Sequence, residues 1–432
     1  MTLSRPNLIK ILGPAAVFCA VLAALLALNG RGHGPAANGG LVAPGVSGGG
    51  LDDPIPALQS ALREDPSNVA AYAALGEAYL QRARATGDPS LYSRAGRAFD
   101  AALRRDATDP GALIGAGTLA GLRHDFRDQL RRGLAARRAA PDLARPYTVI
   151  ADAQIELGRY GPAAHSIQRL VDLKPGLAAY ARASYFRELT GDLSGAVEAM
   201  RLAASAGGTP ESVAYVQALL GDLQLQRGEL GVARTAYLAA LRSMPDYPRG
   251  LIGLARLDAA GGDYGSAAAR LRRATDQLPL TSALTLLAEV EQAEGRPEAA
   301  DADLAAAHAQ QRILRSSGAR PDAEAVLFEA NHGSRAEAVR LGRRVWLAAP
   351  SVRSADALGW ALTRAGRPRQ GYAFARRALT LGSGDALFRL HAGISAMKTG
   401  HPGETAHDLA IAEAARAALS PRAVALLEEA RR

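Results

Sequence analysis

The sequence repeats itself at intervals of 34 residues, and this period constrains the fold more than any other feature. Pro141 and Pro175 are 34 residues apart, and so are Pro245 and Pro279. Before three of these prolines, a glycine, a tyrosine or leucine, and an alanine recur at matching offsets: Gly158, Tyr160 and Ala163; Gly228, Leu230 and Ala233; Gly262, Tyr264 and Ala267. A fixed period of this length is typical of a stacked array of small units rather than of one globular core.

Each repeat is predicted to be a hairpin of two α-helices. The chain is rich in alanine and has only 5% aromatic residues, a composition that favours closely packed helices over a β-rich core. A glycine such as Gly262 suits the left-handed residue that ends a first helix, and a proline such as Pro279 cannot continue a second one. We therefore expect an all-α, right-handed α-solenoid of about ten hairpins over residues 54–432, with a capping helix at each end.

The first full unit carries residues that identify the type of repeat. Its first helix holds large, Leu-Gly and aromatic residues, and its second holds two small residues around an aromatic one: Tyr72, Leu75, Gly76, Tyr79, Ala95, Phe99 and Ala102. This pattern, repeated along the chain, resembles the tetratricopeptide repeat family. The resemblance implies a protein whose concave inner face, lined by the first helices, binds other proteins or peptides.

On this register the inner face is expected to hold arginines, an acid and apolar side chains. The candidate partner-binding residues are Arg145, Asp152, Arg182, Phe186, Arg249, Ile252, Arg256, Trp360 and Arg364. Arginine and aromatic side chains often dominate protein interfaces. Arg145 and Arg182 are expected to face Asp152, and Arg249 and Arg256 are expected to flank Ile252. Trp360 is expected either to contact a partner or, as the alternative, to pack in the core.

A second candidate surface is a basic patch formed by Arg123, Arg127 and Arg131, which lie on one helical stripe. Its ligand would be an acidic protein, an anionic polymer or lipid headgroups, and the alternative is an outer face that contacts only solvent. The chain has a formal net charge of +9, but no nucleic-acid-binding motif accompanies this charge. We therefore do not expect a nucleic-acid partner.

No motif predicts catalysis or cofactor binding. The string Gly45–Gly49 matches G-x-S-x-G but lies in a glycine-rich segment without the strand and helix that a nucleophile elbow requires. His401 and His407 are six residues apart with Glu404 between them, and no further metal ligand accompanies them. The expectation is a protein that is not an enzyme and that holds neither a cofactor nor a metal.

The N-terminal segment 1–28 is predicted to contain a membrane anchor. Residues 11–28 are uncharged and would span about 27 Å as a helix, close to the thickness of a bilayer core. Arg5 and Lys10 precede this segment, which places the N-terminus in the cytoplasm and the array outside. The alternative is a cleaved secretory signal, after which the protein would be secreted. Residues 29–53 are expected to form a disordered glycine-rich linker.

These features together predict a non-catalytic interaction scaffold tethered on the outer side of the cytoplasmic membrane. Its resemblance to anchored bacterial arrays suggests a role in cell-envelope assembly or polysaccharide export. The alternative is a regulatory or accessory subunit whose catalytic partner is a separate chain.

Overall fold

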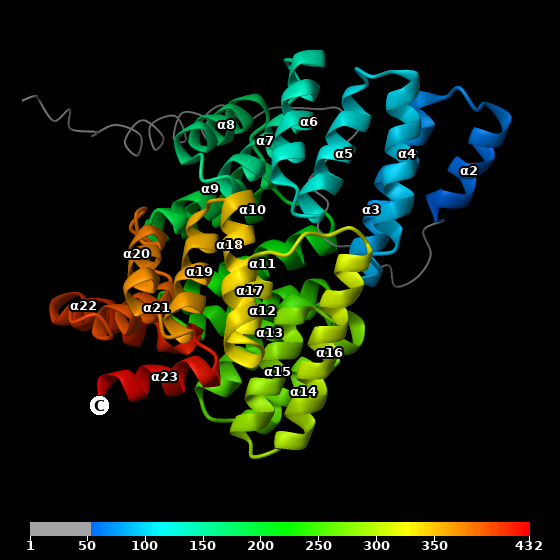
Figure 1. Ribbon diagram of the computed structural model, residues 1–432. Coiled ribbons are helices and arrows are strands. Elements are labelled where there is room, and N and C mark those ends of the chain that lie inside the picture. Colours follow the sequence, from blue (N-terminus) through cyan, green and yellow to red (C-terminus); the bar gives the residue numbers. More distant parts are fainter. Residues whose placement is uncertain (1–52) are drawn as a thin grey trace, which may run out of the picture. The chain divides into compact units, whose positions relative to one another are not determined.

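The computed structural model describes residues 53–432, and every regular element in this range is helical (Figure 1). The predicted anchor 11–28 and the linker up to residue 52 lie outside the described residues. Within residues 53–432, no helix is both long enough and apolar enough to cross a bilayer.

The first eleven helices are α2 (Pro54–Glu64), α3 (Val69–Thr86), α4 (Leu91–Arg105), α5 (Pro110–Leu122), α6 (Phe126–Ala139), α7 (Arg145–Glu156), α8 (Tyr160–Leu173), α9 (Leu177–Leu189), α10 (Leu193–Ser205), α11 (Pro210–Gln226) and α12 (Leu230–Ser243). They are followed by α13 (Pro248–Ala260), α14 (Tyr264–Gln277), α15 (Thr281–Ala293), α16 (Pro297–Ser316), α17 (Ala323–His332), α18 (Arg335–Ala348), α19 (Val352–Arg364), α20 (Pro368–Ala378), α21 (Ala386–Met397), α22 (Pro402–Ala414), the 3-10 helix η1 (Arg416–Ala418) and α23 (Pro421–Arg431).

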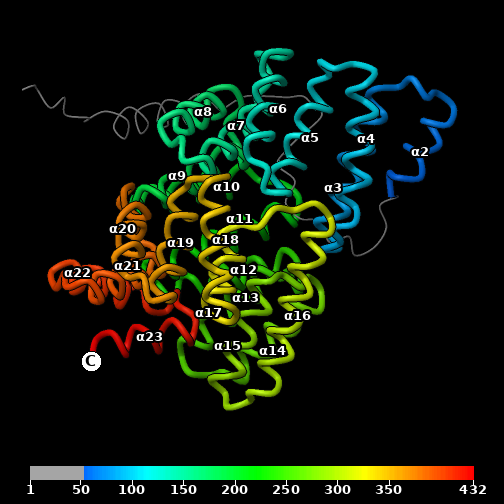
Figure 2. The backbone as a smooth tube through the Cα atoms, viewed as in Figure 1, coloured from blue at the N-terminus to red at the C-terminus, as the bar shows by residue number. Residues whose placement is uncertain are grey.

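Consecutive helices pack against each other in pairs, from α3 with α4 to α21 with α22. The helices α3 to α22 therefore form ten hairpins, with α2 before them and α23 after them. The tube in Figure 2 follows the same succession along the chain. For residues 53–432, the prediction of an all-α array of helix hairpins is confirmed.

The turn inside each unit is determined by local sequence. Between α13 and α14, Gly262 adopts a φ of +82°, a left-handed conformation that side chains disfavour. Asp263 then caps α14, because its carboxylate accepts a 3.0 Å hydrogen bond from the backbone N–H of Ser266. In the second unit the left-handed position, with a φ of +57°, belongs to His124 instead of a glycine.

Glycines on successive first helices make room for an aromatic ring from the second helix between them. The ring of Tyr237 on α12 is fully buried between α11 and α13. A Cβ atom on Gly221 or Gly253 would lie only 2.4 or 2.2 Å from Tyr237 Cε1. The same arrangement recurs around Phe99 on α4. These glycines therefore set the distance between neighbouring units, which side chains of any size would increase.

Helices in the last third of the chain pack against helices of the earlier units. Val352, at the start of α19, belongs to one apolar cluster with Ile155 of α7 and Leu189 of α9, and Phe388 of α21 packs against the same cluster. Further along, η1 packs on α11 and α13, and α23 packs on α15. In Figure 1, α19 lies next to α9. Units that are distant in sequence are thus in direct contact.

Candidate functional site

The charged residues predicted for the inner face are largely paired within the array. Arg145 of α7 donates a 2.7 Å hydrogen bond to Glu77 of α3. Arg182 of α9 makes two bonds of 2.7 Å to the two carboxylate oxygens of Asp152 on α7. Arg182 thus faces Asp152 as expected, whereas Arg145 pairs with a different acid. Such charge-assisted pairs link first helices of different units.

The carboxylate of Asp222 on α11 interacts with two of the predicted inner-face arginines and with one tyrosine. Arg249 donates to its Oδ2 atom at 3.1 Å, Arg256 lies 3.7 Å from its Oδ1 atom, and the Tyr237 hydroxyl donates to Oδ1 at 2.9 Å. Burial, with a further contribution from the Asp222 charge, raises the pKa of Tyr237 far above its usual range. The tyrosine therefore remains a donor. Ile252, which the two arginines were expected to flank, packs against a core cluster.

The aromatic candidates are packed inside the protein. Trp360 is 1% exposed, donates to Asn331 Oδ1 at 2.9 Å and stacks on His391 with 4.2 Å between ring centroids. Arg364 lies 5.7 Å from the centre of the Trp360 ring, within cation–π range. Phe186 is partly buried against the cluster around Val352 mentioned above. Core packing, the alternative considered for Trp360, fits this burial.

A junction joins the turn between α5 and α6 to the segment between α16 and α17. The backbone N–H of Arg320 donates to the carbonyl of Arg123 at 2.9 Å, and its guanidinium donates to Asp125 at 2.5 Å. His124 Nδ1 lies 2.8 Å from the carbonyl oxygen of Arg320, and it must carry a proton because a carbonyl only accepts. His124, in its left-handed backbone conformation, thus contacts Arg320, which is 196 positions away in the sequence.

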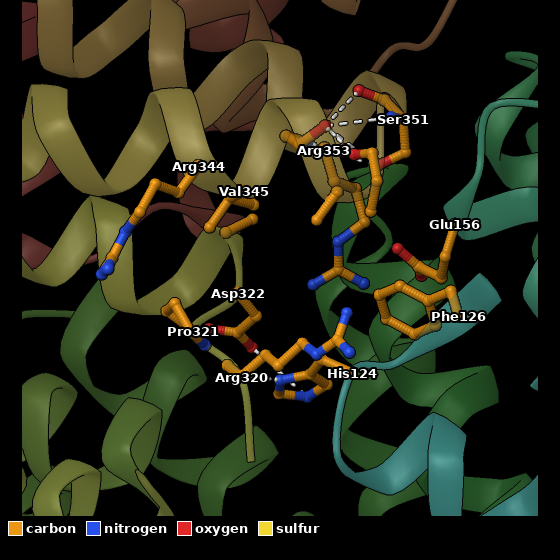
Figure 3. A pocket seen from close by; sticks show the side chains of 14 residues that line it. His124, Phe126, Glu156, Arg320, Pro321, Asp322, Arg344, Val345, Ser351 and Arg353 are labelled. Atoms are coloured by element: carbon orange, nitrogen blue, oxygen red, sulfur yellow. Dashed lines mark hydrogen bonds and ion pairs between the residues drawn. The ribbon is translucent and has the colours of Figure 1, made fainter. Parts of the chain in front are cut away.

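A cavity of about 440 Å³ opens beside this junction. Its walls come from the α5–α6 turn, the end of α7, the segment before α17, and helices α18 and α19, and its charged residues are Glu156, Arg320, Asp322, Arg344 and Arg353. Figure 3 shows the guanidinium of Arg353 pointing into the space between Asp322 and Glu156. The cavity is therefore lined both by the residues just before α17 and by residues of α18 and the start of α19.

The charges of this cavity are only partly compensated. Burial raises the pKa of Glu156, and the nearby charge of Arg353 opposes that rise. Arg353 also lies 3.4 Å from the hydroxyl of Tyr185. Arg344 is exposed and makes no hydrogen bond or ion pair with any residue between 53 and 432. One wall thus carries mixed charges, and the α18 side carries a free guanidinium.

Of the three arginines of the predicted basic patch, Arg127 and Arg131 lie one turn apart on α6, whereas Arg123 lies in the turn between α5 and α6. Arg131 pairs with Asp128 on its own helix, and Arg123 is half-buried beside Gly318. Arg127 reaches α18 and donates to the backbone carbonyl of Leu347 at 2.9 Å. Arg127 therefore contacts α18, Arg131 pairs on its own helix, and Arg123 belongs to the junction with Arg320.

Helix α18 also contributes residues that sequence reasoning missed. Arg340, Arg343 and Leu347 have the i, i+3, i+7 spacing of one helical face, a signal that was available in the sequence. The sequence did not show that these residues lie opposite Arg127, because that arrangement depends on the contact between units that are distant in the chain. Among the described residues, no group of three or more His, Cys, Asp or Glu side chains could hold a metal ion.

No protein-family model and no curated protein matches this sequence. Several solved structures show a partial likeness to this chain. A human IFIT1 dimer with PPP-AAAA is 15% identical, with 76% of this chain and 78% of that chain covered and a TM-score of 0.46. PilW, described as a widely conserved type IV pilus biogenesis factor, is 18% identical, with 48% and 97% covered and a TM-score of 0.39. YrrB, described as a TPR protein with an unusual peptide-binding site, is 16% identical, with 52% and 93% covered and a TM-score of 0.25.

The fold is a solenoid of tetratricopeptide-like hairpins. Its ten consecutive hairpins, and the aromatic rings held between glycines of successive first helices, carry this conclusion. The solenoid pairs most of its predicted inner-face charges internally, whereas Arg344 at the cavity and Arg343 on α18 have no acidic partner among residues 53–432. These places are the strongest candidates for contact with a partner.

Proposed function

We propose that the solenoid is a non-catalytic scaffold that binds other proteins. The observation that carries this proposal is the cavity beside the His124–Arg320 junction, with the unpaired Arg344 on one wall and Arg353 inside it. A packed array of helices presents such a hollow without rearrangement, which lowers the entropic cost of binding. Exposed arginines in a formed recess are typical of protein recognition.

We further propose that the scaffold acts at the cytoplasmic membrane, outside the cytoplasm, in cell-envelope assembly or polysaccharide export. Support comes from the uncharged segment 11–28 and from the positive residues that precede it. A long glycine-rich linker would let the tethered array search a volume near the membrane, which raises the effective concentration of its partners. Secretion after cleavage of the segment is the alternative.

Two measurements on the full-length chain test this proposal. The first is crosslinking in intact cells followed by affinity purification and mass spectrometry. Recurrent non-enzymatic partners would support a scaffold, a single stoichiometric enzyme would favour an accessory subunit, and capture of no partner would refute both. The second is protease digestion from outside intact cells. Cleavage of the array only after lysis would refute the outward orientation.

A further inference from the structure

The exposed face of α18 combines one apolar side chain with several cations. Leu347 is 72% exposed, the highest value among the large apolar residues of the described chain. Arg343 and Arg344 precede it by one helical turn and are both exposed. The guanidinium of Arg127 lies next to Leu347, because this guanidinium donates a hydrogen bond to the Leu347 carbonyl. A ligand that covers this face would therefore need an apolar group for Leu347 beside anionic groups for the arginines.

The cations on this face lack acidic partners within the described chain. Arg343 and Arg344 make no hydrogen bond or ion pair with any residue of the range 53–432. Arg127 bonds to a backbone carbonyl, which leaves its charge uncompensated. By contrast, Arg340 on the same helix pairs with Glu337. The surface around Leu347 therefore carries a local excess of positive charge.

The cavity limits where an anionic ligand can bind. Arg344 belongs both to this face and to the cavity wall, whereas Glu156 and Asp322 lie on either side of Arg353 inside the hollow. Their negative charges would repel a carboxylate that entered deeply. A carboxylate is thus favoured outside the hollow, at the exposed guanidinium groups of Arg343 and Arg344.

We infer that Arg127, Arg343, Arg344 and Leu347 form a docking surface for an acidic peptide segment of a partner protein. Carboxylates of the segment bind the three guanidinium groups, and an apolar side chain between them covers Leu347. A small inorganic anion would satisfy the arginines and leave Leu347 exposed, so a chain that alternates acidic and apolar residues fits better. This inference rests on the proposed scaffold function and names the partner chemistry for it.

Fluorescence anisotropy with the purified full-length chain tests the surface. The probe is a short labelled peptide of Glu, Asp and Leu, and the control peptide replaces its acids by Gln and Asn. The double variant Arg343→Glu, Arg344→Glu is expected to weaken binding of the acidic peptide at least about tenfold. Leu347→Ser is expected to weaken it several-fold, and rising salt should weaken it in the parent protein. Arg104→Glu, at an exposed position on α4, is the matched control and should bind like the parent.

Four outcomes would overturn the docking surface. They are equal binding of the uncharged peptide, an unchanged affinity in the double variant, an unchanged affinity in Leu347→Ser, and binding of inorganic phosphate or anionic vesicles with the same dependence on the two arginines. Circular dichroism of each variant establishes that its helices are intact. In the crosslinking experiment above, partners retained by the double variant would refute this surface and leave the scaffold proposal standing. Capture of no partner by the parent protein would refute the scaffold proposal itself.

Discussion

The backbone N–H of Val352, at the start of α19, donates a 2.7 Å hydrogen bond to the hydroxyl of Tyr160, the first residue of α8. The two residues are 192 positions apart. Neighbouring side chains of the two helices share one apolar cluster, which includes Ile155 and Leu189. The bond therefore marks the place where the last third of the chain is attached to the earlier units.

Replacement of Tyr160 by Phe should weaken this attachment without breaking the array. The variant leaves the Val352 N–H without its acceptor and is expected to cost about 1 kcal/mol. Amide hydrogen exchange should become faster at the start of α19 and stay unchanged in α3 and α4. Equal acceleration in both regions would contradict a local role for the bond.

The glycines around Tyr237 should tolerate no side chain. In Gly253→Ala the new methyl group would lie 2.2 Å from the tyrosine ring, so we expect a loss of about 1–3 kcal/mol in the free energy of unfolding. Gly231→Ala is the matched control, because nothing lies within 4 Å of its added Cβ atom, and a small gain from helix propensity is expected there. Chemical denaturation compares the two, and similar midpoints would refute the close approach.

The pair of Asp152 and Arg182 should contribute more to stability than a surface ion pair. Arg182 is only 9% exposed, so Asp152→Ala leaves a buried guanidinium without its acid and should cost about 1–3 kcal/mol. Arg82→Ala removes an exposed pair with Asp53 and should cost less than about 1 kcal/mol. The prediction fails if denaturation midpoints shift equally in the two variants.

Two carboxyl groups should make stability depend on pH near neutrality. Burial raises the pKa of Glu188 to about 7 and that of Glu211 to about 7, from an ordinary value of 4.5. The folded protein therefore binds more protons than the unfolded chain between about pH 4.5 and 7, and its free energy of unfolding falls as pH rises through this window.

Glu188→Gln should remove part of this dependence. The amide oxygen can still accept the 2.7 Å bond that Gln226 donates to Glu188, while the charge that burial disfavours is absent. We expect a gain on the order of 1–3 kcal/mol above pH 7 and little change near pH 4.5. Urea denaturation at both pH values measures this difference, and a gain of the same size at pH 4.5 would contradict the assignment.

The sequence predicted side chains on the inner face but not their partners. The repeat register placed Arg145 and Asp152 on the same helix and suggested that they face each other. In the structure Arg145 bonds to Glu77, two units earlier, because the curvature of the array brings α3 within reach of α7. Curvature accumulates from small rotations between units, and a 34-residue period does not encode their size.

The sequence by itself determined the units of this protein. The spacing of glycine, aromatic and proline residues specifies helix, turn and helix, since these are local consequences of backbone conformation and side-chain size. Only the tertiary structure decided which distant units touch. The contacts of Arg320 with His124, of Val352 with Tyr160 and of Arg127 with Leu347 connect residues that no repeat relates to one another. These contacts exist because the array curves far enough for its late helices to pack against its early ones. The candidate binding surface on α18 depends on this packing, because Arg127 comes from an early unit.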